Sequence, residues 1–424
     1  MTKQILILFL ITFLFLTKSI AIELNKNKNS SVNFHGYFRD GFGVSDQGDK
    51  QTSFGLPFAA AKYRLGNEND TDVELAVDYR YYVNGINNNK HVQLYFMMDG
   101  YATYENDFKL ERIPQIYASF NNIIADGINV WIGRRYYDRK DIHMNDHFWL
   151  NTAQNADKGA AAGIEGVVLS GVKLKFAVIQ GIDNQADNTM TLFYDLRVSD
   201  IPLNESGKLT LWGIYAKRYA PEDTSVPLLL ALENKNGYGF GGWYDLKIGN
   251  TITNTTAVLY RYGAAVPSHD FNHNPLINDP SIQDVNYLEI NNNFLYEGMK
   301  NLSMQWASVY RITEQTQTTK GTYDINWYST GVRPIYYLSQ YMNLATEVGY
   351  DYIDNKSSQQ KGSLFKGTVA LELTLEKGYY KRPVLRLFQT VAKWDNDFKG
   401  DVGGTAYMNS TKGYSTGAQV EWWW

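Results

Sequence analysis

The chain has 424 residues, no cysteine and a formal net charge of −4, with 32 Tyr, 20 Phe and 10 Trp. Beyond the N-terminus, no stretch approaches the roughly 18 apolar residues that a transmembrane helix needs, and the mild acidity argues against a nucleic-acid partner. The length would allow several soluble domains. No linker or composition break divides residues 32–424, however, which favours a single domain there.

The N-terminus predicts an export signal. Lys3 precedes an apolar run at residues 5–16, and Ser19-Ile20-Ala21 is typical of a small-x-small cleavage site. A retained membrane anchor is the alternative, but this run is too short to span a bilayer about 30 Å thick. We therefore expect residues 1–21 to be removed and residues 22–31 to form a short polar leader.

Residues 32–44 alternate in polarity with a period of two. The even positions are apolar from Val32 onward, with Asp40 as the exception, and the odd positions carry Asn33, His35, Tyr37 and Arg39. A period of two predicts a strand whose two faces meet different environments. Tyr37 and Arg39 then belong to the polar face.

Later segments repeat this alternation at residues 302–312, 344–352 and 368–375. Each run is about ten residues long, which is the length that a tilted strand needs to cross a bilayer. A secreted sandwich also alternates, but its strands average about five or six residues. Tracts rich in Asn, Asp, Gly and Pro separate the runs and fit turns and loops; they include residues 84–89, 267–280, 354–361 and 399–412.

The C-terminal segment, residues 417–424, alternates and ends on an aromatic. Ala418, Val420, Trp422 and Trp424 share one face, and Gln419, Glu421 and Trp423 share the other. This pattern is typical of the closing strand of an outer-membrane barrel, where aromatics sit at the membrane boundary. A closed barrel is also the non-helical structure that satisfies its backbone in lipid, and the chain is long enough for 16 or 18 strands. Trp423, on the polar face, is a candidate for binding a solute in the lumen.

Three stretches resemble the maltoporin family of sugar-specific outer-membrane channels. They are His35-Gly36-Tyr37-Phe38-Arg39-Asp40-Gly41, the segment KYRLGNE at residues 62–68, and the segment GRRYYDRKDIHMND at residues 133–146. The resemblance implies an all-β fold: a transmembrane antiparallel β-barrel of 18 strands, assembled as a homotrimer in the outer membrane of a Gram-negative bacterium. It also implies a pore narrowed by an inward-folded constriction loop, here about residues 139–151.

The resemblance further implies how an oligosaccharide crosses the pore. Aromatic rings contact the C–H face of the sugar, charged groups bond its hydroxyls, and many weak sites in series let it leave again. The aromatic path would comprise Tyr37, Tyr380 and Trp423, with Phe148 at the constriction and Phe108 lent to the neighbouring subunit. The polar track would comprise Arg39, Arg64, Glu74, Arg112, Arg139, Asp141 and Asp146.

Two departures from the family pattern affect the path. Phe148 stands where the family usually has a tyrosine, so one hydroxyl is lost. Asp72 stands where a tyrosine of the aromatic path is expected, so the path is interrupted or rerouted there.

Asp141 and Asp146 could form a glycosidase pair, but we expect the neighbouring arginines and lysines to lower both pKa values, and hence no enzyme activity. His143 and His147 lack the flanking Glu of a zinc-protease helix, so we expect neither a metal nor another cofactor. The sequence therefore predicts passive diffusion of maltodextrin-like oligosaccharides through a membrane channel. The alternatives are a general or ion-leaning porin on the same barrel and a secreted carbohydrate-binding β protein.

Overall fold

The computed structural model describes residues 21–103, 107–152, 160–184, 189–219, 235–266, 285–315 and 323–424. The expected signal peptide, except for its last residue, and the loop at residues 267–280 lie outside the described residues. In the described ranges, no helix is long and apolar enough to cross a membrane.

The described elements are almost all strands, with two short 3-10 turns near the C-terminus. They are β1 (Ile22–Lys26), β2 (Ser30–Ser45), β3 (Asp70–Tyr82), β4 (His91–Thr103), β5 (Leu110–Asn121), β6 (Asn129–Arg134), β7 (Lys140–Ile142), β8 (His147–Leu150), β9 (Ala161–Leu169), β10 (Val172–Asn184), β11 (Thr189–Asn204), β12 (Gly207–Tyr219), β13 (Lys235–Ile248), β14 (Ile252–Gly263), β15 (Val285–Met299), β16 (Leu302–Gln315), β17 (Tyr323–Tyr337), β18 (Met342–Asn355), β19 (Gln360–Thr374), β20 (Val384–Trp394), η5 (Asn396–Phe398), η6 (Gly404–Tyr407) and β21 (Lys412–Trp423).

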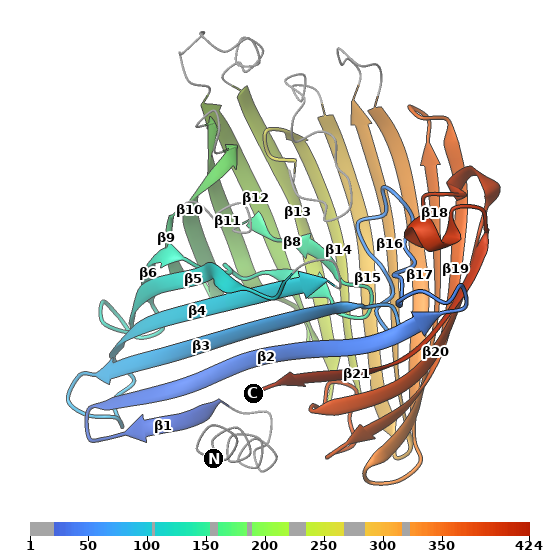
Figure 1. The fold of residues 1–424 in the computed structure, drawn as a ribbon. Coiled ribbons are helices and arrows are strands. Elements are labelled where there is room, and N and C mark those ends of the chain that lie inside the picture. Colours follow the sequence, from blue (N-terminus) through green and yellow to red (C-terminus); the bar gives the residue numbers. More distant parts are fainter. Residues whose placement is uncertain are drawn as a thin grey trace.

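The sheet closes on itself, because β21 pairs with β2 in register from Tyr37↔Trp423 to Ser45↔Ser415. The sheet holds 19 strands, of which β1 lies beside the end of β2, so 18 strands form the closed ring. All consecutive pairings are antiparallel, as predicted. Part of the expected polar leader is thus a strand, with Ile22 opposite Phe34. Figure 1 shows β1 beside β2, and strongly tilted β2 to β5 facing the steeper β15 to β19.

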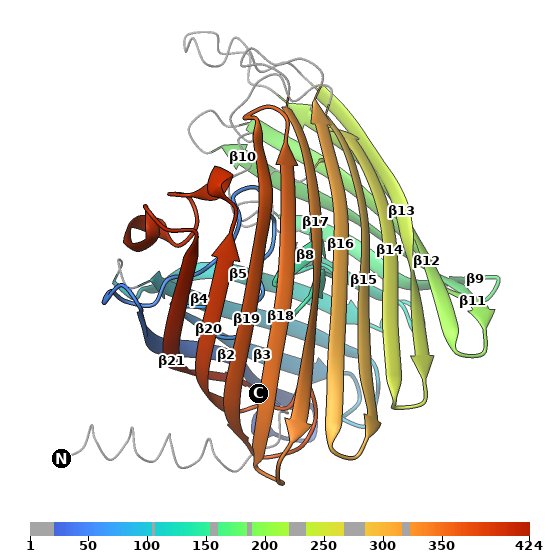
Figure 2. The ribbon, with the colours of Figure 1, turned by 90° about the vertical axis from the view of Figure 1, so that its right-hand side faces the viewer.

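Polar residues point inward and apolar residues outward, the reverse of a water-soluble protein. On β18, Glu347 and Asp351 are 0% and 3% exposed, whereas Val348 and Tyr350 are 42% and 40% exposed. The alternation predicted for β16, β19 and β21 likewise places polar side chains inward and apolar side chains outward. Figure 2 shows β15 to β20 as one continuous wall. An apolar exterior around a polar interior is what a barrel in lipid requires. This confirms the prediction of a transmembrane barrel.

The loop between β6 and β9 folds into the barrel and carries the hairpin of β7 and β8 (Figure 1). Ile142 and Leu150 are fully buried. The loop is fixed to the far wall, since His147 Nε2 lies 2.8 Å from Glu289 Oε1 and Arg333 donates to the Met144 carbonyl at 3.2 Å. The prediction of an inward-folded loop at residues 139–151 is confirmed.

A second segment, residues 51–69 between β2 and β3, also folds inside. The Tyr63 hydroxyl lies 3.0 Å from the Ser329 hydroxyl on β17, and Lys366 Nζ on β19 donates to the Leu65 carbonyl at 2.8 Å. This segment joins the first loop, because the Arg64 backbone N–H donates to the Met144 carbonyl at 3.1 Å. We call residues 51–69 the inner segment. It narrows the lumen together with the constriction loop, and the sequence did not predict its path.

The Tyr63 ring of the inner segment packs against two glycines of the wall, Gly331 and Gly349. A Cβ atom at Gly349 would overlap the Tyr63 ring, so Gly349→Ala should push the segment toward the lumen. Such overpacking costs about 1–3 kcal/mol. We expect a lower melting temperature and a smaller single-channel conductance. Gly367→Ala is the matched control, because a Cβ there meets nothing nearer than Val391 at 3.6 Å; equal behaviour of the two variants would contradict the packing argument.

Candidate solute-binding site

A cavity of about 1010 Å³ lies between the β2–β5 wall and the two inward segments. Ten of the twelve predicted site residues line it: Tyr37, Arg39, Arg64, Glu74, Arg112, Arg139, Asp141, Asp146, Phe148 and Trp423. The other two, Phe108 and Tyr380, are not among its lining residues. The cavity therefore brings together residues that lie far apart in the sequence, from Tyr37 on β2 to Trp423 on β21.

Tyr37 and Trp423 lie side by side in the cavity. Their rings are stacked with centroids 6.4 Å apart and an interplanar angle of 17°. The His143 ring lies 5.7 Å from Trp423 and 5.7 Å from Tyr380. His143 thus connects Tyr380, which stands in the short turn after β19, to the stacked pair. Sequence reasoning placed the three aromatics on one path but gave His143 no role in it.

Phe108 lies outside the cavity of its own subunit. Its ring covers Gly100 of β4, where a Cβ atom would come within 2.7 Å of Phe108 Cζ. Gly100 points outward, because Asp99 and Tyr101 on either side of it line the cavity. The Phe108 ring is 47% exposed there. It is consequently available at the outer surface of the barrel.

At the constriction, Arg139 is held between two aromatic rings. Its guanidinium carbon lies 4.3 Å from the Tyr136 ring centroid and 4.6 Å from that of Phe148. Stacking of this kind orients a guanidinium while leaving its edge N–H groups to donate hydrogen bonds. Phe148 therefore positions the Arg139 guanidinium, a role for which a ring without a hydroxyl suffices.

Glu421 is the centre of a buried charge network. Its carboxylate accepts hydrogen bonds from Arg382 at 2.8 Å, Arg386 at 3.0 Å and Arg64 at 3.3 Å, and from the Tyr37 hydroxyl at 3.2 Å. Arg382 and Arg386 were not predicted as site residues. They lie on the turn and strand that precede β21, and the pairing of β20 with β21 brings them to Glu421.

Arg39 holds a second network beside the first. Its guanidinium contacts Asp70 at 2.9 Å, Glu68 at 3.2 Å and Asp72 at 3.5 Å. Burial opposes the ionisation of Glu68, but Arg39 and Arg64 outweigh it and hold the pKa of this carboxyl well below its usual range. Ion pairs therefore fix the cationic groups at this side of the lumen in place.

The expected lowering of both loop carboxyl pKa values is wrong for Asp141. Burial raises the pKa of Asp141 above its ordinary value and outweighs the opposing effect of Arg139. Sequence reasoning counted the neighbouring cations but not the desolvation of the Asp141 carboxyl in the folded loop.

His143 gives a prediction about pH. Burial and the nearby Arg64 cation lower its pKa to about 3, so the ring stays neutral from pH 8 down to pH 5, where a free histidine would gain a proton near pH 6.5. We expect open-channel conductance to show no titration step near pH 6.5 that depends on this residue. Conductance of the wild type and of His143→Asn, recorded from pH 8 to pH 5, checks this. A step in the wild type that the variant lacks would show that His143 titrates.

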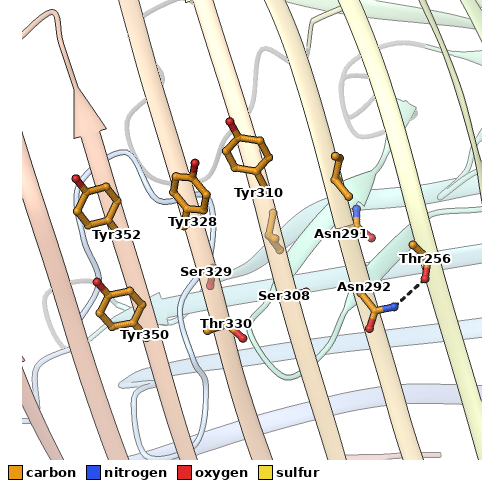
Figure 3. A pocket seen from close by; sticks show the side chains of 12 residues that line it. Thr256, Asn291, Asn292, Ser308, Tyr310, Tyr328, Ser329, Thr330, Tyr350 and Tyr352 are labelled. Atoms are coloured by element: carbon orange, nitrogen blue, oxygen red, sulfur yellow. Dashed lines mark hydrogen bonds between the residues drawn. The ribbon is translucent and has the colours of Figure 1, made fainter.

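A second hollow, of about 500 Å³, lies on the outer face of β14 to β18 and is not part of the lumen (Figure 3). Tyr310 and Tyr328 at its rim stack with centroids 4.5 Å apart. Aromatic residues on the outer surface are typical of the girdles at the membrane boundary. We therefore assign these tyrosines to the membrane-facing surface.

Comparison with known proteins agrees with this architecture. Residues 32–424 match the LamB porin family. The outer-membrane channel DcaP of Acinetobacter baumannii has a similar fold, with a TM-score of 0.51 and 12% identity, over 95% of this chain and 100% of that chain. The anion-selective porin from Comamonas acidovorans gives a TM-score of 0.45 at 11% identity, over 93% of this chain and 100% of that one. The family match covers the whole barrel, so the chain belongs to the LamB porin family and forms a channel in the outer membrane of a Gram-negative bacterium.

Proposed function

We propose that this channel is selective for sugars and lets maltodextrin-like oligosaccharides diffuse passively along its aromatic path. The stacked pair of Tyr37 and Trp423, which lines the cavity beside Arg39 and Arg64, is the observation that carries the proposal. A pyranose needs an apolar surface for its C–H face and hydrogen-bond partners for its hydroxyls. This part of the lumen offers both within one cavity.

The ion pairs of the lumen support selectivity by holding the polar groups in place. Arg64 is held by Glu68 at 2.6 Å and by Glu421 at 3.3 Å. A side chain that is already ordered loses little entropy when it binds a solute. Carboxylate and guanidinium groups in fixed positions can each form a hydrogen bond with a hydroxyl of the sugar. Each contact can then be weak, as passage requires.

We further propose that the working unit is a homotrimer without catalytic activity. The exposed ring of Phe108 on the outer face of β4 supports this arrangement. From that face it can reach the pore mouth of an adjacent subunit, which is the position that the family resemblance predicts for it.

A general or ion-leaning porin is the second candidate, and Asp72 favours it. Its carboxylate, 3.5 Å from Arg39, replaces an aromatic surface by a charged one. If the path were broken there, the cavity would still conduct ions and small solutes but would hold sugars poorly.

Single-channel recording in a planar bilayer separates the two candidates. The purified protein is titrated with maltose through maltohexaose and, separately, with sucrose. Conductance steps in threes that sugars close saturably, with affinity rising with chain length, are expected for the sugar channel. An open channel that no sugar blocks would reject the proposal in favour of a general porin.

A further inference from the structure

Asp72 stands where the aromatic path is expected to break. In antiparallel sheets, residues directly opposite each other point to the same face. Asp72 pairs with Arg39 on one side and with Tyr101 on the other. Tyr101 therefore points into the lumen next to Asp72, and it lines the same cavity as Tyr37 and Trp423.

The Tyr101 ring is open to the cavity. Its exposed fraction is 46%, which is large for a residue inside a barrel. Its hydroxyl interacts with the Asp70 carboxylate, which leaves the ring face for contact with a solute. Tyr101 is thus an aromatic surface at the position next to the one that lost its ring.

The register fixes the distance of this ring from the stacked pair. Tyr37 lies opposite Glu74, which lies opposite Asp99, so Tyr101 is two strands across and two residues along from Tyr37. With strands about 4.8 Å apart and a rise of about 3.4 Å per residue, the Cα separation is roughly 12 Å. From position 72 the same estimate is roughly 8 Å. The ring has therefore moved away from the stacked pair by one strand.

Asp72 lies in the gap between the rings. Its side chain is 27% exposed, and its ion pair with Arg39 at 3.5 Å orients it. A carboxylate in this position can accept hydrogen bonds from the hydroxyls of a sugar whose C–H face lies on Tyr101. A ring and an acceptor on adjacent strands have the same two functions as the stacked pair with its charged neighbours.

We propose that Tyr101 and Asp72 together form a sugar subsite that reroutes the aromatic path by one strand, from β3 to β4. The subsite rests on the proposed function, because it assigns a further solute contact in the same pore. It lies nearer than Tyr37 to the end of the barrel where β4 finishes. A long oligosaccharide spans both sites, whereas maltose on the stacked pair alone does not reach Tyr101.

The test uses maltohexaose and maltose as blockers of the purified channel. Tyr101→Leu should raise the half-blocking concentration of maltohexaose roughly five- to tenfold, because an aromatic contact is lost, and should leave that of maltose almost unchanged. Tyr101→Phe should behave as the wild type, since the ring remains. Tyr79→Leu is the matched control, because Tyr79 on β3 faces outward and is 37% exposed.

A second variant tests the rerouting itself. Adding Asp72→Tyr to Tyr101→Leu returns the ring to β3 and should recover most of the affinity for maltohexaose. If Tyr101→Leu yields no heat-modifiable barrel, Tyr101→Trp replaces it, and the larger ring should lower the half-blocking concentration.

The outcomes separate this inference from the proposed function. A wild-type channel that no sugar blocks overturns both. A wild-type channel that sugars block, with Tyr101→Leu or Tyr101→Trp indistinguishable from it, overturns only the subsite. A loss in Tyr101→Phe equal to that in Tyr101→Leu also overturns it, since the hydroxyl bond to Asp70 would then be the important contact.

Discussion

Replacing Trp423 by alanine is expected to weaken the block of the pore by maltohexaose by about 10- to 100-fold. The variant removes the larger ring of the stacked pair and the surface that faces Arg382, whose guanidinium carbon lies 4.3 Å from the ring centroid. Loss of an aromatic contact and of its buried area is worth roughly 1.5–3 kcal/mol, and each 1.4 kcal/mol is about tenfold in affinity. Current-noise titration with maltohexaose gives the affinity directly.

Trp306→Ala is the matched control for this experiment. Trp306 on β16 faces outward and is 44% exposed, so it contacts no solute in the lumen. Each variant removes one indole, Trp423→Ala from the lumen and Trp306→Ala from the outer face. Both should leave the open channel intact. An unchanged affinity in Trp423→Ala, or an equal loss in Trp306→Ala, would place the sugar elsewhere in the pore.

Strand polarity was predictable because the two faces of a barrel strand meet lipid and water. Tyr37 and Trp423 fell on the lumen face from alternation alone, and the structure places both rings in the cavity. The alternation is a local property, since each residue contacts the solvent of its own face. The family resemblance added the number of strands and the loop at residues 139–151, which alternation could not supply.

The path of the inner segment was not predictable, because its contacts are remote in sequence. Tyr63 packs where Gly331 and Gly349 carry no side chain, and its hydroxyl reaches Ser329. The apolar residues of the inner segment do not reveal which strands of the barrel they will pack against. The glycines were the available signal, since two of them on adjacent strands leave room for a ring.

The role of Tyr101 was hidden for a similar reason. The sequence shows that Asp72 lacks a ring, but the neighbour that supplies one depends on the pairing of β3 with β4. A shift of one residue in that register would turn Tyr101 to the outer face. The roles of Arg382 and Arg386 likewise depend on a strand register, because the pairing of β20 with β21 places both beside Glu421.

Glu421→Gln is expected to destabilise the barrel and to shift the pore toward anions. The carboxylate is 1% exposed and neutralises Arg64, Arg382 and Arg386. Removing one partner from a buried charge network typically costs about 3–5 kcal/mol, and without Glu421 the positive charges are only partly compensated, Arg64 by Glu68 and Arg386 by Glu372. Arg64 also belongs to the inner segment, so its loss of a partner should loosen that segment from the strands.

Two measurements check this prediction. The temperature at which the heat-modifiable form collapses in detergent should fall, and the reversal potential in a salt gradient should move in the direction of anion permeation. Glu205→Gln is the control of equal charge change, because Glu205 lies exposed in the turn between β11 and β12. It should alter neither value. If Glu421→Gln also altered neither value, the other carboxylates beside the three arginines would suffice to compensate their charge. Glu421 would then not be the group that holds these cations in place.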